Sequence, residues 1–88
     1  HNIIEANKVK KILEKLNIFS NEVTANFLLL NFDKCKFSAK YVFNKLQSKG
    51  IILRSTEDGY NIKNKLRLTI GSKKENIRFI TTIKSIFN

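Results

Sequence analysis

An arginine stands inside a stretch that otherwise has the composition of a β-strand. Residues 65–71 read Lys-Leu-Arg-Leu-Thr-Ile-Gly. The leucines and the isoleucine alternate with Arg67 and Thr69, and successive side chains of a strand point to opposite faces of its sheet. The pattern places Arg67 on the face opposite the apolar residues. A guanidinium donates two parallel hydrogen bonds to a carboxylate or a phosphate. Arg67 is therefore a candidate to bind an anionic ligand.

A second arginine stands at a comparable place. Arg54 ends the apolar run Ile-Ile-Leu that follows Gly50, so we expect it at the end of another strand. Two guanidinium groups close to each other would hold a dianion. The alternative is that Arg54 and Arg67 pair with acids nearby in the sequence, such as Glu57. The spacing alone leaves both interpretations open.

Other kinds of site chemistry find little support. The only histidine is His1, and the only cysteine, Cys35, has no histidine to activate it, so we expect neither a nucleophile nor a metal site. Glu57 and Asp58 are adjacent in a predicted turn, where two acids do not flank one substrate bond. The three glycines lie too far apart for a phosphate-cradling loop. We expect no catalytic residue in this chain.

Hydrophobic periodicity predicts the elements that carry the arginines. Helices are expected over 2–16, 38–49 and 73–87, and strands over 25–31, 51–53 and 65–71. Ser72 and Glu75 have the spacing of a capping box, so a strand leads into the last helix. This order predicts an α+β fold, a small mainly antiparallel sheet with helices packed on one face.

Several details of these elements are also predicted. The continuous apolar run at 25–31 favours a strand covered on both faces. Asn26, inside that run, either bonds a neighbouring backbone or orients a polar site. Gly50 is expected to end the second helix in the left-handed conformation. The core side of the last helix is expected to be Ile77, Phe79, Ile80, Ile83 and Phe87.

Composition limits the classes of partner. Eighty-eight residues make one domain, residues 1–88. The formal net charge of +10 raises the alternative of a small basic nucleic-acid-binding module. All but three of the seventeen basic residues are lysines, spread along the chain, so we expect a solvated lysine-rich exterior instead. No apolar run approaches the roughly 20 residues of a membrane span. A lone cysteine favours a reduced, intracellular protein, and a chain beginning with histidine favours a processed or excised piece.

Four sequence blocks carry a likeness to a known family. They are Ala-Asn-Phe-Leu-Leu at 25–29, Gly-Ile-Ile-Leu-Arg at 50–54, Leu-Arg-Leu-Thr-Ile-Gly at 66–71 and Lys-Glu-Asn at 74–76. In order and approximate spacing they resemble the C-terminal small domain of fold-type I pyridoxal-phosphate aminotransferases, most closely the histidinol-phosphate aminotransferases. The resemblance implies that Arg67 grips the substrate's carboxylate or phosphate, that Arg54 lies near the same anionic end, and that Asn26 lies near the substrate at the domain boundary.

The resemblance also implies what this chain does not supply. The family's Schiff-base lysine, its aspartate on the pyridine nitrogen and its phosphate-binding residues belong to a large domain that no stretch here resembles. The implied whole enzyme is a cytoplasmic homodimer that transfers an amino group to 2-oxoglutarate in histidine biosynthesis. Its pyridoxal phosphate is held by a large domain of the same or a companion chain. This chain alone is expected to bind no cofactor and to catalyse nothing, and a split or decayed fragment without activity is a further alternative.

Overall fold

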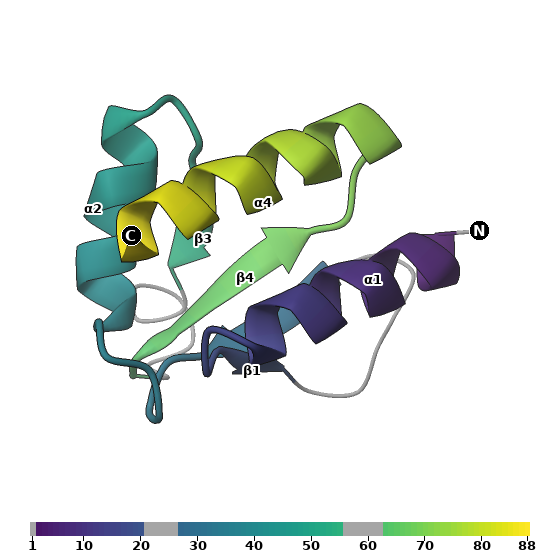
Figure 1. Cartoon of the computed structure of the whole chain (residues 1–88). Coiled ribbons are helices and arrows are strands. Elements are labelled where there is room, and N and C mark those ends of the chain that lie inside the picture. Colours follow the sequence, from purple (N-terminus) through teal and green to yellow (C-terminus); the bar gives the residue numbers. More distant parts are fainter. Residues whose placement is uncertain (1, 21–26, 56–62) are drawn as a thin grey trace.

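Three helices lie against one face of a four-stranded antiparallel sheet in the part of the chain that the structure describes (Figure 1). The computed structural model describes residues 2–20, 27–55 and 63–88. In chain order the elements are α1 (Asn2–Glu14), β1 (Phe19–Ser20), β2 (Phe27–Asn31), α2 (Ala39–Ser48), β3 (Arg54–Ser55), β4 (Lys65–Thr69) and α4 (Lys73–Phe87). No helix within these ranges is long and apolar enough to cross a bilayer.

The sheet has the strand order β1-β2-β4-β3, and every neighbouring pair is antiparallel. β2 and β4 pair over five residues each, with Leu28 opposite Leu68 and Leu30 opposite Leu66. These four leucines are at most 5% exposed and belong to the same core cluster as the buried residues of all three helices. The predicted α+β fold, with a small antiparallel sheet and helices on one face, is confirmed.

The strand expected over residues 51–53 was placed too early. The strand β3 begins at Arg54, so this arginine starts a strand instead of ending one. The backbone N–H of Ile51 donates to the carbonyl of Leu46 at 2.9 Å, and the N–H of Gly50 donates to Gln47 at 3.0 Å. Residues 50 and 51 therefore still close the end of α2, and the chain pairs with β4 only after this turn is complete.

The predicted start and end of α2 and the predicted start of α4 are confirmed, whereas α1 ends at Glu14, two residues before the predicted end at residue 16. Ser38 is the N-cap of α2, and its hydroxyl accepts the backbone N–H of Tyr41 at 3.1 Å. Gly50 follows this helix with φ of 87°, a conformation that costs residues with a Cβ atom about 1–2 kcal/mol. At the start of α4, Ser72 and Glu75 form the capping box in both directions.

The expectation that β2 is covered on both faces is wrong for its described residues. Leu28 and Leu30 are fully buried under the helices, whereas Phe27 and Leu29 are only partly buried. The helices pack on one side of the sheet, so the alternate residues of β2 face the other side. This face is left open by the described part of the chain.

The core side of α4 also differs at one position. Phe79, Ile80 and Ile83 are buried as predicted, but Ile77 is 57% exposed. The buried stripe begins instead at Asn76, which precedes Phe79, Ile80 and Ile83 by three, four and seven residues. Ile77 is displaced by about 100° around the helix axis from this stripe.

Candidate anion-binding site

The structure brings together the two arginines that the sequence identifies as candidates for anion binding. Arg54 on β3 and Arg67 on β4 are direct register partners of an antiparallel pair. Side chains at directly opposite positions lie on the same face, with their Cβ atoms about 4.5–5.5 Å apart. Thirteen positions of sequence separate the two residues, and the register of the sheet places them side by side. Asn26, the third predicted site residue, lies outside the described residues.

Two like charges in opposite register positions destabilise a sheet unless something lies between them. Within the described residues, neither Arg54 nor Arg67 forms an ion pair with an acid, and the one ion pair found there joins Lys8 to Glu5 at 3.5 Å. Asp33 accepts a hydrogen bond from Asn64 at 2.9 Å. Glu57 lies outside the described residues, so pairing with that acid stays a sequence-based alternative.

The arginines belong to the sheet face that the helices do not cover. We call this surface the open face and define it by the alternate strand residues Phe27, Leu29, Asn31, Lys65, Arg67, Thr69 and Arg54. None of these seven residues is buried. Three are cationic and none is acidic, so the strands of the open face present positive charge next to apolar side chains. Such a surface suits an anion attached to an organic group.

Arg67 is partly enclosed by its neighbours on this face. Its guanidinium carbon lies 5.3 Å from the centroid of the Phe27 ring, which is within the range of a cation–π contact. Its Nε atom is buried and has no hydrogen-bond partner among the described residues. The side chain is therefore held against β2 with one donor unused.

A tightly bonded corner follows β4 and fixes how this strand enters α4. The side-chain amide of Asn76 donates to the carbonyl of Gly71 and accepts its N–H, both at 3.2 Å. The N–H of Ser72 donates to the Glu75 carboxylate at 2.9 Å. The backbone N–H of Ser72, together with its side chain, lowers the pKa of Glu75 below its ordinary value of 4.5.

Asn76 was not given a role by the sequence reasoning. It is 6% exposed and is the buried polar residue of the described part of the chain. The signal that identifies it is its position at the head of the apolar stripe of α4, where an amide needs a specific partner. Gly71 provides that partner with both of its backbone groups.

The described residues do not assemble another reactive centre. Within residues 2–20, 27–55 and 63–88, no group of three histidine, cysteine or acidic side chains lies close enough to hold a metal ion. Cys35 is partly buried and has a free thiol. The hollows of about 170 Å³ between α1 and α4 and of about 400 Å³ beside the end of β4 are lined by neither Arg54 nor Arg67. The arginine pair therefore lies outside these two hollows.

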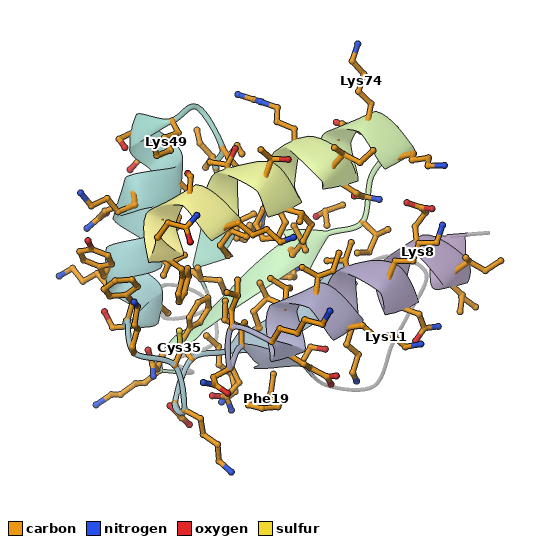
Figure 2. All side chains as sticks on the ribbon, in the orientation of Figure 1. Lys8, Lys11, Phe19, Cys35, Lys49 and Lys74 are labelled. Carbon is orange, nitrogen blue, oxygen red and sulfur yellow. The ribbon has the colours of Figure 1, made fainter. Side chains whose placement is uncertain are left out.

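The lysines are distributed over several elements. In Figure 2, Lys8 and Lys11 extend outwards from α1, Lys49 from the end of α2 and Lys74 from the first turn of α4. All four are exposed. This distribution agrees with the predicted lysine-rich exterior, and these four residues do not form one basic cluster.

Known proteins resemble this chain in both sequence and fold. No protein-family model matches the sequence. The histidinol-phosphate aminotransferase of Pelagibacter ubique (strain HTCC1062) is 85% identical over 88 residues, 100% of this chain and 24% of the relative. That of Buchnera aphidicola subsp. Schizaphis graminum (strain Sg) is 37% identical over 78 residues, 89% of this chain and 20% of the relative.

Among solved structures, the histidinol-phosphate aminotransferase from Clostridium acetobutylicum superposes with a TM-score of 0.81. The superposition covers 94% of this chain and 25% of that chain, and the identity of 20% makes it a likeness of fold. The chain spans about a quarter of the length of the Pelagibacter relative and less of the Buchnera relative. The chain therefore corresponds to one portion of these much longer proteins.

Proposed function

We propose that this chain, which belongs to the histidinol-phosphate aminotransferase family and spans about a quarter of the length of its Pelagibacter ubique relative, is the lobe that binds the substrate's anionic group. In this proposal residues 1–88 form the C-terminal small domain. A large domain, in the same or a companion chain, encloses the open face and holds the cofactor. Closure of such a lobe excludes water and orients the substrate.

The opposed arginine pair is the observation that carries the proposal. Arg54 and Arg67 occupy opposite register positions on the open face, an arrangement that is unfavourable without an anion between the charges. Each guanidinium offers a fork of donors, and two forks match the charge and oxygen atoms of a phosphate dianion. The same pair would bind a carboxylate with one fork. We assign the anion contact to Arg67, the added positive charge to Arg54, and a substrate-side position to Asn26.

The described residues do not fit pyridoxal phosphate itself. An enzyme holds this cofactor with a lysine that forms an imine and a partner for the pyridine nitrogen, and the cofactor supplies carbanion stabilisation. Glu5 lies on α1, Asp33 bonds Asn64, and Glu75 caps α4, so these acids are committed elsewhere. We therefore place the cofactor on the companion large domain and derive no step of this chain through it.

The substrates follow from the charge of the open face. Histidinol phosphate presents a phosphate to the arginine pair, and 2-oxoglutarate, as the amino acceptor, presents a carboxylate. Both ligands thus use the same cations in alternate half-reactions. We further propose that the whole enzyme is a cytoplasmic homodimer.

A chimeric enzyme tests this function. This chain replaces the homologous segment of the Pelagibacter ubique enzyme, which matches it over its full length. In this chimera, Arg67→Lys is expected to reduce kcat/KM for histidinol phosphate by about 30- to 700-fold, or about 2–4 kcal/mol, because lysine lacks the planar fork. Arg78→Lys is the matched control, because Arg78 is exposed on α4 and donates to the carbonyl of Lys49.

Each outcome has a distinct meaning. Equal kcat/KM values for Arg67→Lys and Arg78→Lys would contradict the anion-binding role. A folded chimera without activity, beside an active recipient enzyme, would favour the alternative that this domain has lost its function. A selective effect of Arg67→Lys would support the proposal.

A further inference from the structure

Arg67 has two contrasting neighbours on the open face across the β2–β4 pair. Leu29 lies directly opposite it, and Phe27, which is opposite Thr69, lies on its diagonal. Diagonal neighbours in an antiparallel pair are about 7–8 Å apart, within reach of long and aromatic side chains. The 5.3 Å contact of the guanidinium carbon with the Phe27 ring shows that the arginine side chain crosses from β4 towards β2.

This direction matters because Arg54 lies on the other side of β4. The strand order places β2 and β3 on opposite sides of β4. A guanidinium that leans over Phe27 therefore moves away from the charge of Arg54. A guanidinium closer to β2 is farther from β3, which carries Arg54, and this reduces the repulsion between the two cations.

Burial also limits which donors of Arg67 a ligand can reach. Nε is buried and has no partner among the described residues. An atom that a water molecule cannot touch is equally closed to a ligand oxygen of the same size. The two terminal nitrogens are the remaining donors of the guanidinium, with four N–H groups between them.

We propose that Phe27 is a positioning residue for Arg67: its ring face holds the guanidinium so that the two terminal nitrogens, and not Nε, receive two oxygens of the substrate's anionic group. The inference rests on the proposed function, in which Arg67 binds that group. An aromatic ring attracts the cation through the negative charge on its face, whereas a leucine of similar bulk does not. A preorganised fork also loses less conformational entropy when it binds.

The chimeric enzyme provides the test, with histidinol phosphate as the ligand. Phe27→Leu is expected to raise KM about threefold to tenfold, the range of one cation–π contact, and to change kcat by less than about twofold. Phe27→Tyr keeps the ring and is expected to restore the KM of the parent chimera. Phe43→Leu is the matched control, because Phe43 packs on the core from α2.

A double-mutant cycle separates this proposal from the proposed function. In an Arg67→Gln background, Phe27→Leu is expected to cause no further rise in KM, because the ring acts only through the arginine. A full further rise, or a KM for Phe27→Leu equal to that of the parent, would overturn the positioning role while leaving the role of Arg67 intact. An unchanged KM in Arg67→Gln alone would overturn both. If Phe27→Leu yields no folded enzyme, a fluorinated phenylalanine at position 27 replaces it in the test, because it keeps the shape of the ring and weakens the negative charge on the ring face. We expect this substitution to raise KM for histidinol phosphate, and an unchanged KM would refute the proposal.

Discussion

Removal of one arginine from the opposed pair is expected to stabilise the chain. In Arg54→Gln, the repulsion between Arg54 and Arg67 disappears, and no ion pair with a described acid is lost. This expectation has the opposite sign to that of the alternative, in which Arg54 pairs with a nearby acid such as Glu57. The sign of the stability change therefore separates an anion site from a structural ion pair.

The size of the effect follows from the sheet geometry. Opposite Cβ atoms in a sheet are about 5 Å apart and diagonal neighbours about 7–8 Å. Because Arg67 contacts Phe27 on β2, away from β3, we take about 8 Å as the distance between the two charges. At that distance in a water-like dielectric, the repulsion is about 0.5 kcal/mol. Screening reduces it only to about 0.4 kcal/mol in 0.01 M salt, where the Debye length is about 30 Å, and to below about 0.1 kcal/mol in 1 M salt.

Urea unfolding at the two salt concentrations measures this change, because guanidinium chloride would itself screen the charges. Arg54→Gln is expected to be more stable than the parent in 0.01 M salt and to lose this advantage in 1 M salt. Arg54→Lys is the control, since it keeps the positive charge and therefore the repulsion. A destabilised Arg54→Gln at low salt, or a gain that does not depend on salt, would refute the reasoning.

Three further predictions concern the turns that hold β4 and α2. Asn76→Leu removes both hydrogen bonds to Gly71 and should lower the free energy of unfolding by about 1–3 kcal/mol; an unchanged urea midpoint would contradict this. Gly50→Ala, at φ of 87°, should cost about 1–2 kcal/mol in the same assay, and no loss would show that the turn adapts. Because Ser72 lowers the pKa of Glu75 below 4.5, the ionised carboxylate stabilises the fold above that pH, and this contribution is lost as the pH falls through the folded-state pKa. The difference in free energy of unfolding between the parent and Glu75→Gln should therefore shrink between about pH 5 and pH 3. A difference that stays constant over this pH range would refute the prediction.

Local sequence patterns predicted the elements well because their causes are local. A hydroxyl three residues before a carboxylate suffices for the capping box of Ser72 and Glu75. The alternation of apolar residues in β4 suffices to place Arg67 on the face of the strand that does not carry Leu66 and Leu68. The errors arose where a local pattern met a competing contact. Ile51 closes the turn after α2, and so the strand begins at Arg54.

Burial on α4 could not be ranked from the sequence alone. Asn76 and Ile77 are adjacent at the start of α4, and hydrophobicity favoured Ile77 for the buried position, whereas Asn76 is the residue that is buried. The backbone of Gly71 offers a donor and an acceptor in the position that Asn76 reaches, so a polar residue takes the buried place. This match depends on how β4 turns into α4, which no single helix pattern contains.

The sequence by itself determined the helices, the arginine-bearing strand and the likeness to an aminotransferase small domain, because periodicity, caps and motif order are properties of neighbouring residues. Only the tertiary structure decided that Arg54 lies opposite Arg67 and that Phe27 lies under the guanidinium. Strand register is set by packing of the whole sheet against its helices. The pairing of Arg54 with Arg67 therefore depends on the register of two strands that are separated in the sequence.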